Sequence, residues 1–474
     1  MTSEGTEPAS RGWGASIAPL RHRNYALVWM AGLVSNVGTW METVAVGSLI
    51  AGDTGKAGWT SFVIAAGFLP MGALGPVGGA FADRFDRRRM LIVMTAAQMV
   101  CAAGLTLLAA TGHATPAAVT ILVFLAGCVA GVGFPAYAAM LPDLVPKEDL
   151  LAAMSLSQAQ WNLGRVVGPS LAGLAILLGS YTTAFALNTV SFAAMLIALR
   201  LLRLEPHQPS TDQTPLWTRI RIGARAARAE PGVWSAIVMI SVVAITASPF
   251  IALIAAMAEV RFDGGASLTS WFTTAQGVGA VAAAFAVPVL ASRLGRYRLL
   301  LASFVLLPAA LVLYGVAPTP WFAALALVGV GATYMSVFSG IGTVAQLRAP
   351  AELRARVLSF YFLALGVIYP IGAVIQGQIA DQIGLGVTTA MSGILLLTAV
   401  VLIRVFDPQR IAALDDQPTG SEPDDVPARA VDERPIEPVA SIEEIERPEP
   451  IEPIEGIEGV EPIEGIEGVE TEPA

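Results

Sequence analysis

The chain has 474 residues, of which 55% are hydrophobic and 14% are charged, and its mean hydropathy is +0.65. An ordinary soluble enzyme is excluded, because about a quarter of the residues of such a protein carry charge. The two cysteines and three histidines do not have the spacing of a disulfide framework or of a metal site. The composition therefore predicts an integral membrane protein.

Apolar segments follow one another along most of the chain, separated by short polar connections. A helix needs about 20 mostly apolar residues to cross a bilayer, and lipid cannot satisfy free backbone donors and acceptors, so each segment is expected to be helical. The alternating pattern of a membrane barrel is not present. We predict an all-α membrane protein with twelve transmembrane helices, at residues 25–49, 58–82, 90–111, 115–140, 150–178, 181–202, 233–258, 267–291, 298–316, 319–345, 353–380 and 385–406.

The basic residues predict how these helices are oriented. Lys and Arg gather near the N-terminus and in every second connection, whereas the alternate connections hold only Lys56 and Arg261. Cytoplasmic loops carry the excess of basic residues, so both termini and the middle loop are expected on the cytoplasmic side of the cell membrane, which requires an even number of spans. No signal peptide is expected in the first 20 residues, which lack an apolar core.

The expected organisation has five parts. Two six-helix bundles are separated by a basic loop and flanked by a short N-terminal segment and an acidic tail. The parts are a cytoplasmic N-terminal segment at 1–20, an N-terminal six-helix bundle at 21–202, a cytoplasmic linker at 203–231, a C-terminal six-helix bundle at 232–406 and an acidic, disordered cytoplasmic tail at 407–474.

The tail carries most of the acidic charge. Residues 407–474 contain 21 acidic and 4 basic residues, a balance of −17, so the net charge of −9 leaves the rest of the chain at +8. The segment PIEGIEGVE occurs at 453–461 and again at 462–470, and its Pro and Gly content disfavours helix and strand. The tail either binds a partner or is a repeat expansion without a function.

The linker is expected to contain an amphipathic helix within LWTRIRIGARAARAEP. Its apolar side holds Leu216, Ile220 and Ala227, and its polar side holds Thr218, Arg221, Arg225 and Arg228. A basic amphipathic helix lies on the inner leaflet of a membrane. The arginines are expected to anchor it to anionic lipid, and binding of a regulator is the alternative.

The two bundles look like copies of one unit. The landmarks that recur are Ala82–Arg89 with Ala291–Arg298 at an offset of 209, Leu144–Leu150 with Leu347–Leu353 at 203, and Pro169 with Pro370 at 201. Charged or kinked landmarks in the same order and at nearly one spacing are typical of the parallel repeats of a transporter.

The connection between the second and third spans has the pattern GxxADRxxRR, formed by Gly79, Ala82, Asp83, Arg84, Arg87 and Arg88. This pattern, with the twelve expected spans and the two halves, resembles the major facilitator superfamily over about residues 20–406. Asp86 stands where the loop motif of the superfamily has glycine, which resembles the drug-export branch that includes the enterobactin exporter. Ser292 replaces the acid in the second copy of the motif.

The resemblance implies a gate at the cytoplasmic mouth. An aspartate at a helix end and nearby guanidinium groups can pair in one conformation and separate in the other. Topogenic charge alone is the alternative for Arg88 and Arg89. The expected gate residues are Gly79, Asp83, Arg84, Arg87, Arg88, Arg293 and Arg296.

The fifth expected span contains GRVVGPSLAG at residues 164–173. It resembles a Gly-Pro element of antiporters in the superfamily, with Ala172 in place of one glycine. Glycine permits close approach of helices and proline bends a span. The resemblance implies efflux rather than uptake, and close packing alone is the alternative. The element consists of Gly164, Gly168, Pro169 and Gly173.

Glu42 and Arg165 are ionisable residues expected well inside spans, where charge is costly. At about 1.5 Å per residue both lie in the outer half of the membrane, so a contact between them is possible. Burial favours the neutral form of a carboxyl, and a paired arginine favours the ionised form. Glu42 is a candidate for proton coupling or cation binding, with an ion pair to Arg165 or exposure at the lipid surface as alternatives. Arg165 is expected to be structural.

In the superfamily that this chain resembles, the first, fourth, seventh and tenth spans face the substrate. A lining of aromatic side chains with few charges suits bulky apolar or cationic compounds better than sugars. A packing role is the alternative at each position. The candidate cavity residues are Asn36, Phe134, Tyr137, Phe250, Tyr334 and Phe338.

A secondary active exporter accounts for these features together. The expected activity is proton-coupled efflux of small, bulky apolar or amphiphilic compounds, of drug or siderophore type, by alternating access. The alternative is a proton-coupled or facilitative importer of a small metabolite. An enzyme or receptor is not expected, because the sequence has no Walker motif and no catalytic constellation. We expect no cofactor, no metal and no nucleic acid, and we expect a monomer whose partners are a small-molecule substrate, protons and the lipid bilayer.

Overall fold

The computed structural model describes residues 17–202, 216–349, 360–361 and 363–415. Every regular element in these residues is helical, which confirms the all-α fold class. Ten of the described helices are long and apolar enough to cross a membrane. The span expected at 25–49 lies within α2 (Arg23–Thr54), which contains Glu42, and α15 (Tyr369–Ile383) covers the last part of the span expected at 353–380. The count of twelve spans stays a prediction.

Six helices form the N-terminal bundle: α2, α3 (Ala57–Arg84), α4 (Arg87–Ala110), α5 (Pro116–Met140), α6 (Leu150–Leu178) and α7 (Tyr181–Leu201). Within it α3 packs against α5, α4 against α5 and α7, and α2 against α6 and α7. The crossing of α3 and α5 depends on glycine, because a Cβ atom on Gly131 would lie 2.8 Å from the carbonyl oxygen of Pro70.

The C-terminal bundle contains α9 (Pro231–Thr246), α10 (Phe250–Ala256), α11 (Gly265–Leu294), α12 (Arg296–Gly315), α13 (Pro320–Arg348), α15 and α16 (Leu385–Phe406). Two π-helical segments, Met257–Arg261 and Ala364–Ile368, follow α10 and precede α15. The span expected at 233–258 is therefore not one continuous helix. It is interrupted between α9 and α10, where Pro249 has no backbone N–H to donate.

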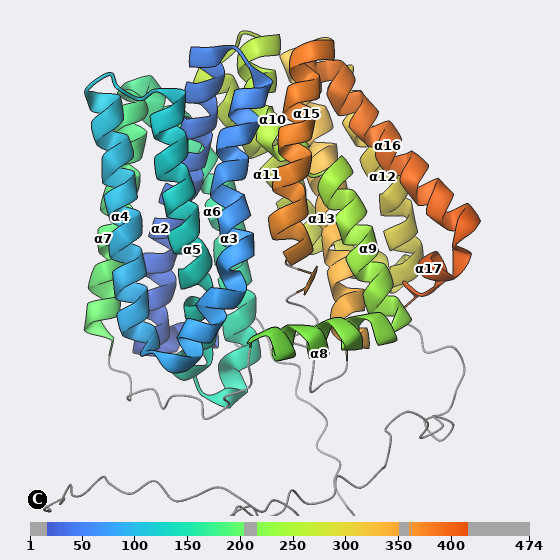
Figure 1. The fold of residues 1–474 in the computed structure, drawn as a ribbon, viewed down its shortest axis with the longest axis horizontal. Helices are drawn as coiled ribbons and strands as arrows, with labels where there is room; N and C mark the ends of the chain where they lie inside the picture. The colour runs from blue at the N-terminus through green and yellow to red at the C-terminus, as the bar shows by residue number, and fades with distance from the viewer. Residues whose placement is uncertain (1–16, 203–215, 350–359, 362, 416–474) are drawn as a thin grey trace, which may run out of the picture. The chain divides into compact units, whose positions relative to one another are not determined.

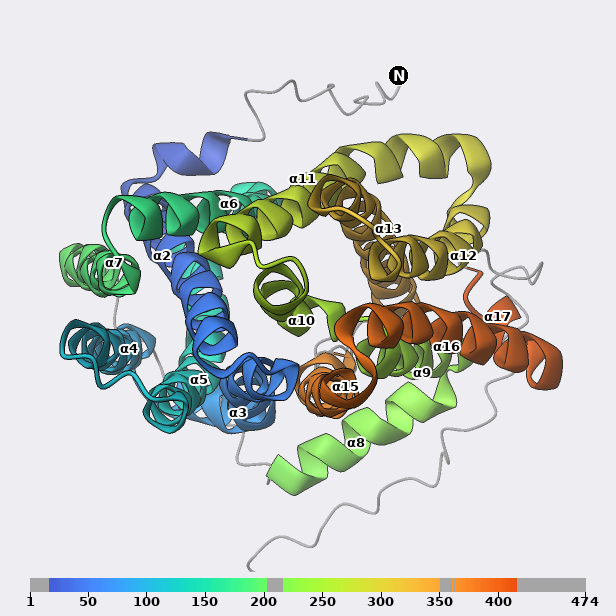
Figure 2. The same cartoon turned by 90° about the horizontal axis from the view of Figure 1, so that it is seen from above.

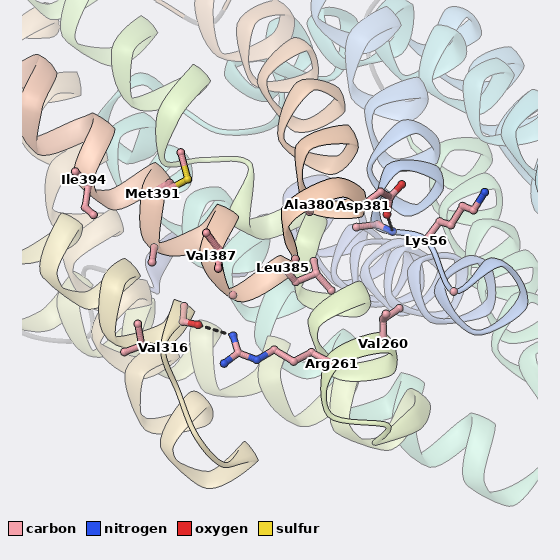
Figure 3. A pocket seen from close by; sticks show the side chains of 16 residues that line it. Lys56, Val260, Arg261, Val316, Ala380, Asp381, Leu385, Val387, Met391 and Ile394 are labelled. Carbon is pink, nitrogen blue, oxygen red and sulfur yellow. Dashed lines mark hydrogen bonds between the residues drawn. The ribbon is translucent and has the colours of Figure 1, made fainter.

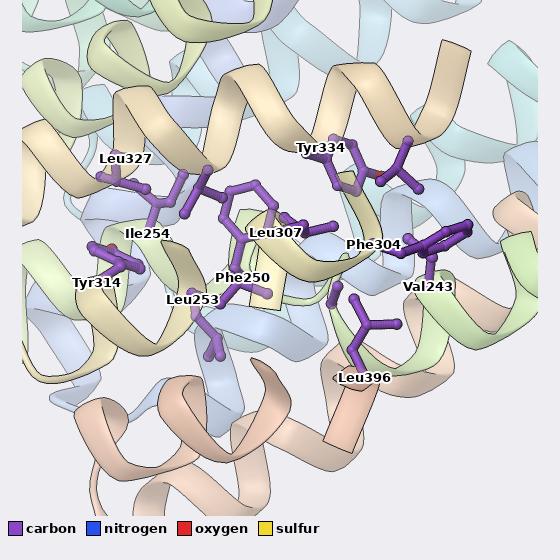
Figure 4. Packing of buried hydrophobic residues seen from close by; sticks show 14 of the residues in the cluster. Val243, Phe250, Leu253, Ile254, Phe304, Leu307, Tyr314, Leu327, Tyr334 and Leu396 are labelled. Carbon is purple, nitrogen blue, oxygen red and sulfur yellow. The ribbon is translucent and has the colours of Figure 1, made fainter. Parts of the chain in front are cut away.

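Large side chains fill the core of the C-terminal bundle (Figure 4). Phe250, Phe304 and Tyr314 are at most 1% exposed. Phe250 meets Tyr334 edge to face, with ring centroids 5.6 Å apart. In a bilayer such packing stabilises the bundle through close van der Waals contact rather than through removal from water.

The linker helix α8 (Leu216–Ala229) packs against α9. The side chains expected on its polar side, Thr218, Arg221, Arg225 and Arg228, are exposed, and Ala227 is buried. The side chains of Leu216 and Ile220 lie outside the described residues. The guanidinium of Arg228 lies over the ring of Trp234, 5.3 Å from its centroid, and so ties α8 to the start of α9.

The acidic tail was expected from residue 407, but the structure continues as a helix beyond that position. The short helix α17 (Pro408–Ala412) packs on α9 and α16, and both Ile411 and Leu414 are 1% exposed. The Nη1 atom of Arg348 donates to the Asp415 carbonyl at 3.1 Å. Residues 407–415 therefore belong to the C-terminal bundle, and the nine-residue repeats lie outside the described residues.

The largest contacts between the bundles are those of α3 with α15 and of α6 with α11 (Figures 1 and 2). We call the end of the bundles at which α8 lies the linker end and the opposite end the distal end. At the distal end, the Asp381 carboxylate accepts hydrogen bonds from the Ala57 and Gly58 N–H groups, at 2.7 and 3.1 Å. Nearby, the hydroxyl of Ser48 donates to the carboxylate of Glu259. The distal end is closed by contacts between the bundles.

The helices of the second pair separate toward the linker end. The hydroxyl of Ser270 on α11 donates to the Pro169 carbonyl on α6, and a Cβ atom on Gly277 would lie 3.0 Å from the side chain of Val166. Further toward the linker end, six of the seven residues at 284–290 of α11 are exposed. These six residues lie on all sides of the helix, so no neighbouring helix covers it there. On α6, Leu151 and Met154 are 78% and 54% exposed. The two bundles therefore meet at the distal end and in the middle and part toward the linker end.

Candidate functional site

The loop motif at the linker end holds the N-terminal bundle together. Asp86 caps α4 by accepting a hydrogen bond from the Arg89 N–H group at 2.7 Å, which gives a local role to the aspartate that replaces glycine. Arg87 donates to the Ala139 carbonyl (2.8 Å) and to the carboxylate of Asp143 (3.0 Å). These contacts attach the start of α4 to the end of α5.

Arg88 makes a similar attachment to α7. Its guanidinium donates to the carbonyls of Leu199 (2.7 Å) and Arg200 (2.8 Å), at the C-terminal end of that helix. Cations are favourable there because the helix dipole is negative at its C-terminus. Arg88 thus joins α4 to α7 within the N-terminal bundle. The other expected gate residues are at helix ends: Gly79, Asp83 and Arg84 in the last part of α3, Arg293 near the end of α11, and Arg296 at the start of α12.

The Gly-Pro element lies where α6 meets its neighbours. Gly164 faces the side chain of Asn36, whose Nδ2 group donates to the carbonyls of Gln160 and Trp161, both at 3.1 Å. A Cβ atom on Gly168 would lie 2.6 Å from Trp40, and one on Gly173 would lie 2.6 Å from Ser270. Glycine is therefore required for α2 and α11 to approach α6 this closely. Pro169 lies within α6, and its carbonyl accepts the contact from α11 described above.

The structure does not bring Glu42 and Arg165 together. The carboxylate of Glu42 accepts a hydrogen bond from the Nδ2 group of Asn188 on α7 at 2.7 Å, inside the N-terminal bundle. The guanidinium of Arg165 instead points between the bundles, where it donates to the Oε1 atom of Gln276 on α11 at 3.2 Å. It also lies over the ring of Trp40, 5.4 Å from the centroid. The ion pair considered from the sequence is absent from the described residues.

Arg165 lines a cavity of about 40 Å³ between the bundles. The cavity is bounded by α2, α3, α6, α10 and α11, and its polar lining includes Trp40, Gln276 and three threonines. No Asp or Glu is among the described residues that line it. The threonine hydroxyls already donate to carbonyls one turn earlier in their helices, at 2.9 Å for Thr43, 3.3 Å for Thr269 and 2.9 Å for Thr273.

The six candidate cavity residues divide into exposed and packed groups. Phe134 is 51% exposed and meets Trp161 with ring centroids 6.5 Å apart. Tyr137 donates to the Oε1 atom of Gln160 at 3.4 Å. Phe250, Tyr334 and Asn36 are buried, with Tyr334 3.0 Å from the hydroxyl of Ser248. Phe338 is partly buried, its ring centroid 6.0 Å from that of Tyr361. Of the six, Phe134 has the most exposed ring.

Three residues of this region were missed from the sequence: Trp40, Trp161 and Gln276. Trp40 and Trp161 meet edge to face with centroids 6.3 Å apart and link Arg165 to Phe134. Gln276 offered a signal, because an amide in an otherwise apolar span must find partners. The tryptophans offered a weaker one, since an aromatic residue in a span is as common in packing as in binding.

A wider depression of about 940 Å³ lies at the distal end (Figure 3). It is lined by parts of both bundles, including Lys56 and Asp381 on opposite sides of the α3–α15 contact. Arg261 points into it but donates to the carbonyls of Gly315, the last residue of α12, and of Ala317 just after it, the latter at 2.9 Å. Asp381 and Arg261 thus hold helix ends together in this depression.

The architecture is that of known transporters. A POT family transporter solved in complex with 5-aminolevulinic acid superposes with a TM-score of 0.66 at 12% identity, covering 82% of this chain and 96% of that one. A bacterial homologue of the human lysosomal transporter Spinster, solved in an inward-facing and unoccupied conformation, gives 0.62 at 14% identity, covering 84% and 99%. These likenesses show the fold.

A family model described as transmembrane secretion effector matches residues 14–443. The chain belongs to this family. The transmembrane secretion effectors are major facilitator transporters, so the resemblance drawn from the loop motif is confirmed, as is the fold that it implied. This protein is thus a multi-pass membrane transporter.

Named relatives of this secretion effector are efflux proteins. The multidrug efflux pump Tap of Mycolicibacterium fortuitum is 27% identical over 393 residues, covering 80% of this chain and 94% of the relative. Tap of Mycobacterium tuberculosis (strain H37Rv) is 28% identical over 400 residues, covering 80% and 92%. Macrolide efflux protein A of Streptococcus pyogenes is 24% identical over 386 residues, covering 79% and 94%.

Proposed function

We propose that this secretion effector exports small, bulky amphiphilic compounds from the cell by alternating access. The observation that carries the proposal is the asymmetry of the bundle contacts, which close the distal end while α6 and α11 part toward the linker end. A transporter that binds its cargo between two bundles must open to one side at a time. Export as the direction is supported by the relatives, which are named as efflux proteins and align over nearly their whole length.

The linker end is proposed to face the cytoplasm. The exposed arginines of α8 and the basic loop between α3 and α4 lie at this end. Basic residues are enriched in cytoplasmic loops and are attracted to the anionic inner leaflet. With this orientation α6 and α11 part toward the cytoplasm, the side from which an exporter takes up its cargo. We further propose that the protein acts as a monomer in the cell membrane.

Proton entry is proposed as the driving force, with Glu42 as the coupling group. Its one described partner, Asn188, is neutral, and no arginine, lysine or histidine makes an ion pair with it among the described residues. A carboxyl inside a membrane without a cationic partner is neutralised most simply by a proton. Glu42 belongs to α2 and contacts α7. A proton bound there would therefore act on the packing of the N-terminal bundle rather than on the cargo directly.

Inverted membrane vesicles test the direction and the energy source. Vesicles from cells that express the chain, and matched vesicles with an empty vector, receive a labelled macrolide and ATP to build a proton gradient. Export predicts accumulation only with the chain present, and loss of accumulation when a protonophore is added. The importer alternative predicts accumulation in right-side-out vesicles instead, and that result would replace the proposal.

A further inference from the structure

The cavity between the bundles is lined by a guanidinium, an amide and an indole, and by no carboxylate among the described residues. Arg165 makes one hydrogen bond with the described residues, to Gln276, although a guanidinium has five N–H donors. The Nε2 group of Gln276, a residue that is 1% exposed, is buried and makes no hydrogen bond. The indole Nε1 group of Trp40 is likewise buried and unsatisfied. Three side chains that line this cavity, from three helices, thus have N–H groups without a hydrogen-bond partner among the described residues.

The described lining does not supply an anion for the guanidinium of Arg165. The Oε1 atom of Gln276 is already used by Arg165, and the described lining contains no carboxylate. A positive charge in apolar surroundings is costly unless an anion or a set of acceptors faces it. The missing partner is therefore expected to come from a bound molecule. In this conformation the cavity has a volume of about 40 Å³, which is enough for a group of a few atoms.

An aromatic strip leads from these donors toward the linker end. Trp40 meets Trp161, and Trp161 meets Phe134, with centroids 6.3 and 6.5 Å apart. Counted from the linker end of its helix, Trp40 is residue 18 of α2, Trp161 is residue 12 of α6 and Phe134 is residue 7 of α5. The three rings thus lie progressively closer to the linker end. Trp161 and Phe134 are 42% and 51% exposed, so their rings are available to an apolar molecule entering from the linker end.

We propose that Arg165, Gln276 and Trp40 form a subsite for the anionic carboxylate of an amphiphilic cargo, whose apolar body lies along Trp161 and Phe134. A carboxylate accepts hydrogen bonds only, carries the charge that Arg165 lacks and is small enough for the cavity. The inference rests on the proposed export function. It predicts that amphiphilic anions are transported faster than cations of the same size, whereas the aromatic lining alone suits both.

Transport of three matched fluorescent compounds tests the subsite. One dansyl fluorophore carries a carboxylate, the second an amide and the third a primary amine on the same spacer. Inverted vesicles with the wild-type chain are expected to accumulate the carboxylate faster than the amine. Arg165→Gln should lower the rate for the carboxylate by about tenfold, the effect of losing a charged hydrogen bond, and leave the amine within about twofold. Trp40→Phe, which keeps the ring and removes the donor, should lower the carboxylate rate by a few-fold.

Two further variants separate binding from folding. Arg404→Gln removes an exposed arginine on α16 and is the matched control for Arg165→Gln. Gln276→Glu gives Arg165 an internal carboxylate, so this variant is expected to fold, to lose transport of the carboxylate and to keep transport of the amine. Vesicle content and thermal stability in detergent are measured for every variant.

The outcomes distinguish the subsite from the function. Equal loss of all three compounds in Arg165→Gln and Gln276→Glu, or a wild-type preference for the amine, would overturn the subsite. If the wild-type chain accumulates a macrolide but not the dansyl carboxylate, the subsite is wrong and export stands. If it accumulates neither a macrolide nor any dansyl compound, the proposed function itself fails.

Discussion

Asp381 on α15 caps the first turn of α3 by accepting a hydrogen bond from the backbone N–H of Ala57 at 2.7 Å. A second bond, from Gly58 at 3.1 Å, completes the cap. The first N–H groups of a helix have no partner within it, and the positive end of the helix dipole favours a carboxylate. Here the cap comes from the other bundle, so the contact that satisfies α3 also holds the distal end closed.

Replacing Asp381 with alanine should weaken distal closure. Loss of an N-cap costs about 1 kcal/mol, which raises the ratio of distal-open to distal-closed molecules by about fivefold. Spin labels at the distal ends of α3 and α15 measure this ratio as the share of long distances. Asp53→Asn, an exposed acid at the end of α2, is the control. An unchanged distance distribution in Asp381→Ala would show that the cap does not hold the gate.

Gly72→Val should prevent the conformation seen here. A Cβ atom on Gly72 would lie 2.5 Å from the backbone of Gly366, in the π-helical segment before α15. Backbone cannot move aside as a flexible side chain can, so α3 and α15 must separate. We expect vesicle transport below about a tenth of wild type, with the protein still inserted in the membrane. Gly75→Val, on the same helix with open space beside it, carries the same helix-propensity cost and should keep most activity. Full transport by Gly72→Val would mean that this close approach is dispensable.

Arg87→Gln should destabilise the N-terminal bundle. The variant loses both the ion pair to Asp143 and the hydrogen bond to the Ala139 carbonyl, and a partly buried pair of such contacts is worth about 1–3 kcal/mol. Thermal unfolding in detergent should occur at lower temperature than in Arg89→Gln, which alters an exposed arginine directly after the motif. Equal midpoints for the two variants would point to a gating role for Arg87 rather than a structural one.

Glu42→Gln tests proton coupling. The amide keeps the size of the side chain and removes its titration, so we expect loss of gradient-driven accumulation while exchange of labelled for unlabelled cargo continues. Because no ion pair to Arg165 is present, the variant should fold normally. Glu42→Asp, which retains a carboxyl, is the control that should recover part of the gradient-driven activity. Undiminished proton-driven accumulation in Glu42→Gln would place the coupling group elsewhere.

Removal of the tail should have different effects depending on where it begins. Deletion of residues 418–474 should leave transport unchanged, because a Pro- and Glu-rich repeat cannot form a packed core. Deletion from residue 407 also removes Ile411 and Leu414, both 1% exposed, and should lower stability. Transport by the two truncations, normalised to the amount in the membrane, provides the comparison. Loss of activity with the shorter deletion would show that the tail has a function.

The positions of the helices along the chain could largely be predicted from the sequence, but their rotation about their own axes could not. The spans expected at 150–178 and 385–406 agree with α6 and α16. Glu42 and Arg165 were placed at similar depth, since depth follows from residue count. Whether two side chains meet depends on the directions in which they point, and here Glu42 points to α7 while Arg165 points to α11.

Local chemistry was also recognised more readily than tertiary contacts. The glycines of the Gly-Pro element were expected to allow close approach, and the structure shows which partners approach, namely Asn36, Trp40 and Ser270. The break before α10 was missed because proline also occurs inside unbroken helices of this chain, such as Pro135 in α5. Hydropathy cannot distinguish a proline that bends a helix from one that ends it.

The interruption of the seventh span at residues 247–249 divides it into a fixed part and a plug. The fixed part, α9, is bound at its base by Glu230, which accepts a hydrogen bond from Arg348 of α13 at 2.8 Å. The plug, α10, lies among α2, α3, α11 and α15 in the view of Figure 2, and the π-helical turn after it carries Glu259. A spectroscopic probe on α10 should therefore report when the distal contacts break, as labels on α3 and α15 do, whereas a probe on α9 should change little.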